Sequence, residues 1–192
     1  MKTKLEHPAL IDLIQKAYSA EKAAAFAYQG HARSVKSKDE KLAIKIIEDD
    51  EWNHRREMMD LMKLYDVPVS KWYEFRFHLT GKIISASCYV IGWFMPFYFA
   101  GRLESGNVCE YFHMKHFFNE IGITEHDQIL YDMAIKEKEH EVYFLEQIKT
   151  NKLLPYFEKI FKWGITDSLN NIDFENKKPV EESDVYCKSD NK

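Results

Sequence analysis

The chain has 192 residues, a length that suits one domain or one domain with a tail. Its 27 basic and 31 acidic side chains give a net charge of −4, which argues against a nucleic-acid-binding protein, because such proteins carry a basic excess. Hydrophobic residues make up 45% of the sequence, and only 7 Gly and 5 Pro interrupt it, so we expect an all-α protein.

The cysteines and the N-terminal residues indicate the compartment. Cys88, Cys109 and Cys187 show neither a metal-binding nor a redox spacing. The first residues lack the uninterrupted apolar core of a secretory signal. We therefore expect a reducing, cytoplasmic environment.

The first half of the chain predicts two long helices. Apolar residues recur at helical spacing over residues 8–33, and Pro8 suits the first turn of a helix. A second helix is expected over residues 39–64, ending before the break at residues 66–68. Since only a few residues join them, the two helices should be antiparallel neighbours.

The middle of the chain is aromatic and apolar. An amphipathic segment over residues 70–82 leads into the uncharged residues 83–101, which contain Gly92 and Pro96. Three interpretations stay open for this apolar segment: a buried crossover helix, a surface that dips into a bilayer, and a membrane span. Five aromatic residues would suit an interfacial zone, namely Trp93, Phe94, Phe97, Tyr98 and Phe99.

Two further long helices are expected in the second half. One runs from Arg102 to about Asn119 and is ended by Gly122. The next covers residues 125–149, and Thr124 with Asp127 predicts a capping box at its start.

The chain ends with a short helix and a tail. The short helix is expected over residues 153–163, where an apolar stripe predicts packing on the other helices or, alternatively, contact with a membrane or a second copy. Residues 166–192 are polar and aperiodic and predict a tail. With the long connection over residues 67–101, these elements predict a ferritin-like four-helix bundle over residues 1–165, with a long crossover between helices two and three.

The motif Glu-x-x-His occurs at Glu51/His54 and at Glu137/His140. Residues three apart lie one turn along the same helix face, so a carboxylate and an imidazole converge there on one metal ion. A single motif of this kind is weak, since it also occurs at Glu110/His113, where a solvated helix face is the plainer interpretation.

Glu21 is the expected partner of the first motif. The loop between the first two helices is centred near residue 36, and Glu21 and Glu51 each lie 15 residues from it. In an antiparallel pair the two carboxylates therefore reach the same height.

The third helix offers Glu104 or Glu110 to the second motif. These are six residues apart and cannot both face one site. Glu104 is favoured because Tyr111 follows it by seven residues, as Tyr28 follows Glu21. Four helices then carry Glu, Glu-x-x-His, Glu and Glu-x-x-His, the pattern of di-iron and di-manganese carboxylate bundles.

These motifs resemble those of the demethoxyubiquinone hydroxylase family, a ferritin-like di-iron family that hydroxylates a polyprenylated quinone precursor. The resemblance spans about residues 17–163 and rests on Glu21 to Gly30, Glu51-Trp-Asn-His54, Leu103-Glu104 before Tyr111, and Glu137-Lys-Glu-His140.

The resemblance assigns roles to the metal ligands. It implies that Glu51 and Glu137 bridge two iron ions, that Glu21 and His54 complete one ion, and that Glu104 and His140 complete the other. Tyr28 and Tyr111 would assist beside the ligands, by hydrogen bonding or electron supply, although a purely structural role in the core is equally expected.

The resemblance further implies a monooxygenase with two iron ions, or manganese in their place, and O₂ as co-substrate. Its partners would be a hydrophobic aromatic or quinone-type substrate, an external electron donor and a peripheral membrane contact. A homodimer is a separate expectation, which the apolar stripe over residues 153–163 would allow. Two alternatives stay open. One is a ferritin-like iron oxidase or peroxidase without a rubredoxin-type site, and the other is a non-enzymatic bundle that binds metal or docks on a membrane or partner.

Overall fold

A computed structural model describes residues 4–165, which form six helices and no strand. The predicted all-α class is therefore confirmed. The chain divides into two compact units, with the division between Pro96 and Phe97. The predicted tail over residues 166–192 lies outside the described residues.

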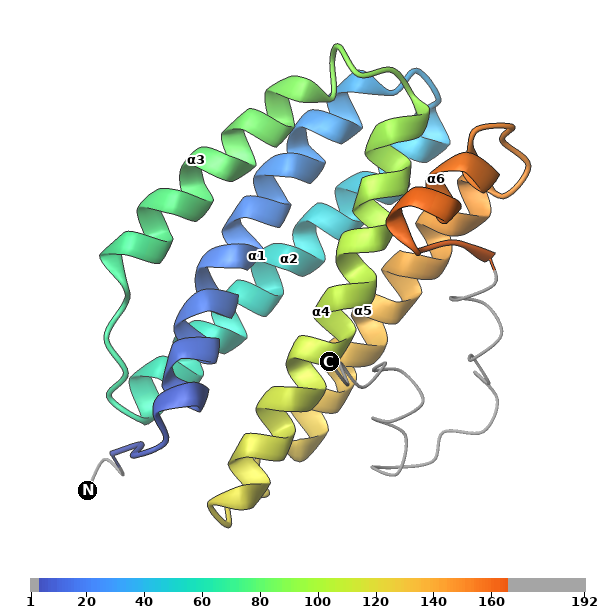
Figure 1. The fold of residues 1–192 in the computed structure, drawn as a ribbon. Coiled ribbons are helices and arrows are strands. Elements are labelled where there is room, and N and C mark those ends of the chain that lie inside the picture. Colours follow the sequence, from blue (N-terminus) through green and yellow to red (C-terminus); the bar gives the residue numbers. More distant parts are fainter. Residues whose placement is uncertain (1–3, 166–192) are drawn as a thin grey trace. The chain divides into compact units, whose positions relative to one another are not determined.

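The first unit holds α1 (Pro8–Ser34), α2 (Lys38–Leu64) and α3 (Lys71–Ser87). Helices α1 and α2 run antiparallel, joined by a short loop, and α3 lies against α1 (Figure 1). Side chains cap all three N-termini: His7 Nδ1 accepts the Leu10 N–H at 3.0 Å, and the hydroxyls of Ser37 and Ser70 cap α2 and α3. The two predicted helices of this half are confirmed.

Small residues bring α3 close to α1. A Cβ at Gly81 would lie 2.7 Å from the backbone of Ala23, and a Cβ at Gly30 would collide with Ser85. Only glycine permits so close a helix contact. Ala23 of α1 therefore meets Gly81 of α3, and Gly30, further along α1, meets Ser85, further along α3. Since the order is the same in both helices, α3 runs parallel to α1.

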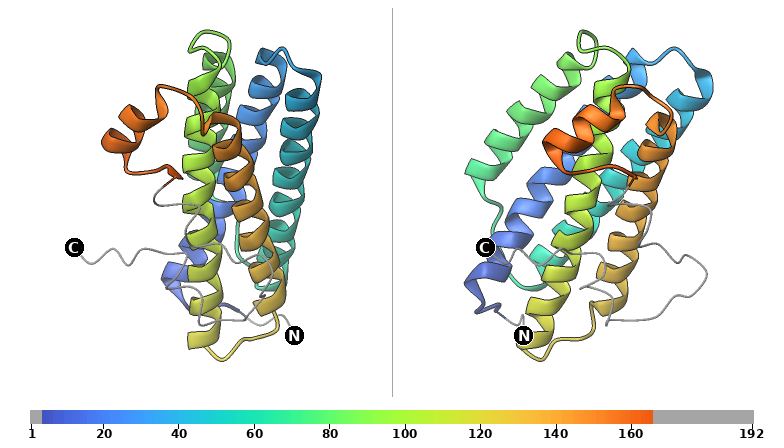
Figure 2. Two further views of the ribbon diagram at one scale, coloured as in Figure 1. Left: turned by 90° about the vertical axis from the view of Figure 1, so that its right-hand side faces the viewer. Right: turned by 45° about the vertical axis from the view of Figure 1, so that its right-hand side comes forward.

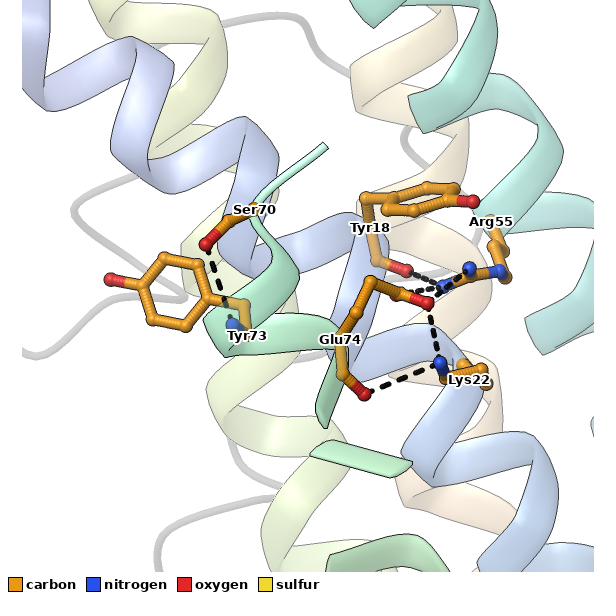
Figure 3. A network of polar contacts seen from close by, with 6 residues as sticks. All are labelled: Tyr18, Lys22, Arg55, Ser70, Tyr73 and Glu74. Carbon is orange, nitrogen blue, oxygen red and sulfur yellow. Dashed lines mark hydrogen bonds and ion pairs between the residues drawn. The ribbon is translucent and has the colours of Figure 1, made fainter. Parts of the chain in front are cut away.

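A polar network also ties α3 to its neighbours. Glu74 of α3 accepts hydrogen bonds from Arg55 of α2, at 3.0 and 3.2 Å, and from Lys22 of α1, at 2.5 Å (Figure 3). The Arg55 guanidinium stacks on the Tyr18 ring, 3.6 Å from its centroid, and donates to the Tyr18 carbonyl oxygen. One carboxylate therefore links all three helices of this unit.

The second unit holds α5 (Asp127–Ile148), α6 (Leu154–Phe161) and all but the first turn of α4 (Phe94–Glu120). Helices α4 and α5 lie side by side and antiparallel, and α6 packs near the α5 C-terminus (Figure 2). As predicted, Gly122 follows the end of α4, and its φ of 78° is the left-handed conformation that glycine favours.

One predicted helix start and one predicted helix cap were wrong. The helix expected from Arg102 begins at Phe94, because Pro96 fits the first turn of a helix and Gly101 lies against the Trp163 ring inside it. The capping box at Thr124 does not form. The N-cap of α5 is His126, without a side-chain hydrogen bond, and the Thr124 carbonyl accepts the Asp127 N–H at 3.1 Å.

The apolar segment over residues 83–101 is not one helix. It contains the end of α3, a connection from Cys88 to Trp93 and the start of α4. In the described part of the chain, no helix is long and apolar enough to cross a membrane. Phe97 and Tyr98 are fully buried, and the Tyr98 hydroxyl donates to the Trp163 carbonyl at 2.8 Å.

Candidate metal centre

The first unit contains one cluster of metal-ligand side chains. Glu21 comes from α1, and Glu51 and His54 come from α2, where their spacing places them on one face. Each offers a ligand atom within 4.8 Å of the other two. The three side chains are 0–5% exposed. We call Glu21, Glu51 and His54 the first half-site.

The second unit contains a matching cluster. Glu104 comes from α4, and Glu137 and His140 come from α5. Their ligand atoms also lie within 4.8 Å of one another, and the side chains are 0–4% exposed. His140 Nδ1 lies 3.6 Å from Glu137 Oε2. We call Glu104, Glu137 and His140 the second half-site.

The structure distinguishes the two glutamates that the sequence offered on α4. Glu104 lies in the second half-site and is fully buried, whereas Glu110 is partly exposed and does not join the cluster. His113, three residues after Glu110, is exposed as well. Metal ligation by Glu104 stays a prediction.

Asn107 is a site residue that the sequence analysis missed. Its side-chain amide donates to Glu104 Oε2 at 2.8 Å and so holds one carboxylate oxygen in place. Its spacing could have identified it from the sequence, because a residue three positions after Glu104 lies beside Glu104 on the helix surface.

Tyr28 and Tyr111 are both buried, at 2% and 1% exposure. Tyr28 lies on α1 and Tyr111 on α4, each about two turns beyond the glutamate of its half-site. Their burial is consistent with a place beside the ligands and equally with a structural role in the core. A part in a reaction stays a prediction.

A second polar cluster, also missed from the sequence, lies beside His140 on α5. Lys138 Nζ contacts Glu141 Oε2 at 2.6 Å, and the Trp163 indole nitrogen donates to Glu141 Oε1 at 2.7 Å. All three side chains are buried. The hydrogen bond from Trp163 to Glu141 holds the segment after α6 against α5. Glu141 is the residue after His140, so this contact lies next to the second half-site.

Each half-site has the chemistry of a site for a divalent cation. Two carboxylates that are buried close together repel each other and lose their hydration, so they need protons or a cation. Carboxylate oxygen with imidazole nitrogen, and without thiolate, is a donor set that suits iron or manganese. The residues therefore fit a divalent metal ion.

The first unit also contains a cavity of about 580 Å³, between the ends of α1 and α3 and the start of α2. Its lining includes His31, Glu40 and Trp93, and the Trp93 indole donates to Glu40 Oε1 at 3.2 Å. Burial of His31 lowers the pKa of its imidazole to about 4, so this side chain is neutral at pH 7.

The chain matches no protein-family model, no curated protein and no solved structure. The resemblance to the demethoxyubiquinone hydroxylases stays a hypothesis that rests on the sequence motifs.

Proposed function

We propose that this protein is a ferritin-like di-iron oxidoreductase, a monooxygenase that uses O₂ to hydroxylate a hydrophobic aromatic or quinone-type substrate. The observation that carries the proposal is the pair of matched half-sites. Each buries two carboxylates and one imidazole on two neighbouring helices.

In this proposal the two helix pairs assemble into one four-helix bundle, and the half-sites together bind two iron ions. The order of ligands supports it, since Glu followed by Glu-x-x-His occurs twice along the chain. The spacing is also similar, with 30 residues from Glu21 to Glu51 and 33 from Glu104 to Glu137. Four carboxylates balance the charge of two Fe²⁺ ions.

The proposed roles follow the sequence motifs. Glu51 and Glu137 would hold both ions, Glu21 and His54 would complete one, and Glu104 and His140 would complete the other. When bound, iron would supply the reduction of O₂ by two electrons from an external donor, with one oxygen atom going to the substrate and the other leaving as water. Asn107 holds the Glu104 carboxylate in place, and Tyr28 with Tyr111 is proposed to donate hydrogen bonds near the ligands.

A hydrophobic substrate also suggests where the protein acts. We propose that it works in the cytoplasm at the inner face of a membrane, from which such a substrate is supplied. We also propose that two copies of the chain associate as a homodimer.

Iron content after anaerobic Fe²⁺ loading and desalting tests the metal centre. We expect two iron ions per chain in the wild type, fewer than two in Glu104→Gln, and two in the matched control Glu110→Gln. Bound metal should also raise the unfolding temperature of the wild type, because it neutralises buried carboxylates. Wild-type protein that retains no iron would contradict the proposal.

The reaction is tested separately from the metal. With a reductant, O₂ and a panel of hydrophobic quinones and phenols, we expect a hydroxylated product from the wild type and none from Glu51→Gln or Glu137→Gln. Iron-loaded protein that only oxidises further Fe²⁺ and forms a large oligomer would instead be an iron oxidase. Iron binding without any turnover would favour the non-enzymatic alternative.

A further inference from the structure

The outward face of α3 is an exposed apolar surface. Within this helix only Gly81 is buried. Four large side chains, at successive spacings of three, four and four residues, lie on one face of the helix and are 50–66% exposed: Trp72, Phe75, Leu79 and Ile83. Soluble monomers seldom expose a continuous apolar stripe of this length, and such a stripe indicates a binding surface.

The connection after α3 exposes three more large side chains. Tyr89 is 58% exposed, Val90 is 81% exposed and Trp93 is 40% exposed. We call these three residues, together with Trp72, Phe75, Leu79 and Ile83, the α3 surface. Three of its seven side chains are Trp or Tyr, the residues that prefer the boundary between lipid and water.

The charges on α3 are as distinctive as its apolar residues. Its basic side chains, Lys71, Arg76 and Lys82, are all exposed. Its one acidic residue, Glu74, is instead held by Lys22 and Arg55 in the network of Figure 3. The exposed charge of α3 is therefore entirely positive, although the whole chain carries −4.

We propose that the α3 surface lies on an anionic lipid bilayer, with the helix parallel to the membrane plane. An amphipathic helix with apolar and aromatic residues on one face and basic residues beside them is the pattern of interfacial binding. Lys71, Arg76 and Lys82 would meet the negative headgroups. This inference deepens the proposed function by naming the surface that meets the membrane; it rests on the proposed membrane location but not on metal binding.

A second copy of the chain fits this surface less well. In a symmetric dimer the same patch meets itself, so the basic side chains of both copies would approach one another without acidic partners. Anionic headgroups complement them instead. The surface is also preformed, since the Glu74 network and the close contact of Gly81 with Ala23 fix α3 on α1.

Vesicle flotation of the full chain tests the inference. The probes are vesicles of phosphatidylcholine alone and vesicles with about a third phosphatidylserine. We expect the wild type to float with the anionic vesicles. Mixed with the neutral vesicles, it should remain in the bottom fraction. The double variant Phe75→Glu/Leu79→Glu should no longer float. The matched control is Leu42→Glu/Ile46→Glu, because these α2 side chains are also exposed, at 63% and 55%, and this variant should float like the wild type.

The basic residues are tested by the triple variant Lys71→Gln/Arg76→Gln/Lys82→Gln. We expect its affinity for the anionic vesicles to fall about tenfold or more, since each charge contributes to the attraction. Circular dichroism checks that every variant is folded. The iron content of each variant should equal that of the wild type, so a failure of lipid binding can be distinguished from a failure of metal binding. A wild type that floats with neither vesicle would overturn the inference. So would a dimer in solution that Phe75→Glu/Leu79→Glu abolishes while flotation persists.

Discussion

The Trp163 indole nitrogen lies 2.7 Å from Glu141 Oε1, and both side chains are buried. The hydrogen bond joins the segment after α6 to α5, one residue from His140. The Trp163 ring also lies where a Cβ on Gly101 would be, so the same side chain contacts α4. Trp163 thus connects three parts of the second unit.

We expect Trp163→Phe to destabilise the protein by about 1–3 kcal/mol, because Glu141 loses a buried hydrogen bond while most of the ring packing is kept. Urea denaturation, followed by circular dichroism, measures the change. Trp72→Phe is the control, since Trp72 is 66% exposed, and it should shift the free energy of unfolding by less than about 0.5 kcal/mol. Equal effects of the two substitutions would contradict this role for Trp163.

The Glu74 network predicts a dependence of stability on pH. Burial by itself would raise the pKa of Glu74, but hydrogen bonds from Arg55 and Lys22 outweigh it and lower the pKa below its usual 4.5. Its contribution to stability is therefore present above pH 4.5 and is lost as the pH falls through the lower, folded-state pKa.

Glu74→Gln should consequently lower the free energy of unfolding at pH 7 by about 1–2 kcal/mol. The difference from the wild type should shrink as the solution is acidified below pH 4.5. Denaturation at a series of pH values checks both points. Glu139→Gln removes an exposed ion pair with Lys136 and should have an effect of less than about 1 kcal/mol at any pH. A difference for Glu74→Gln that grows at low pH would refute the proposed sign.

Gly81 and Gly106 are both helical glycines, yet we predict opposite effects when each becomes alanine. A Cβ at residue 81 would lie 2.7 Å from the Ala23 backbone, whereas a Cβ at residue 106 would meet nothing within 4 Å. Gly81→Ala should therefore destabilise by about 1–3 kcal/mol, since α3 must move away from α1.

Gly106→Ala should stabilise by about 0.5–1 kcal/mol, because alanine has the higher helix propensity. Thermal unfolding of the two variants beside the wild type gives both signs. Stabilisation by Gly81→Ala would show that α1 and α3 are not in close contact.

His31 predicts a second effect of pH. Because burial lowers the pKa of its imidazole from 6.5 to about 4, only the unfolded chain binds a proton between these values. Wild-type stability should thus fall as the pH drops from 6.5 towards 4, by up to about 3 kcal/mol from this residue.

The variant His31→Gln should show a smaller loss over the same interval, measured by denaturation at each pH. His116→Gln replaces an exposed histidine, at 68% side-chain exposure, and should keep the wild-type slope. Identical slopes for the wild type and His31→Gln would mean that the imidazole takes up its proton in the folded protein as readily as in the unfolded chain.

Local patterns predicted the helices well where they were uninterrupted. The helical spacing after Pro8 and the left-handed Gly122 both appear in the structure as expected. The predicted start of α4 was wrong because Pro96 and Gly101 end a helix only in some positions and surroundings. Pro96 falls in the first turn of α4, and the Trp163 ring fills the space beside Gly101.

For the candidate site, residue spacing alone establishes which side chains share a helix face, because three-residue spacing fixes the angle between them. Glu51 with His54 and Glu137 with His140 were found in this way. Which side chains are buried and what they contact depend on the packing of the helices. The structure places Glu104, which the spacing to Tyr111 already favours over Glu110, in the second half-site, and it brings Trp163 to Glu141 and Arg55 to Glu74 across many residues of chain. Contacts between distant segments depend on how the helices pack against one another, and the periodicity of a single helix does not specify its partners.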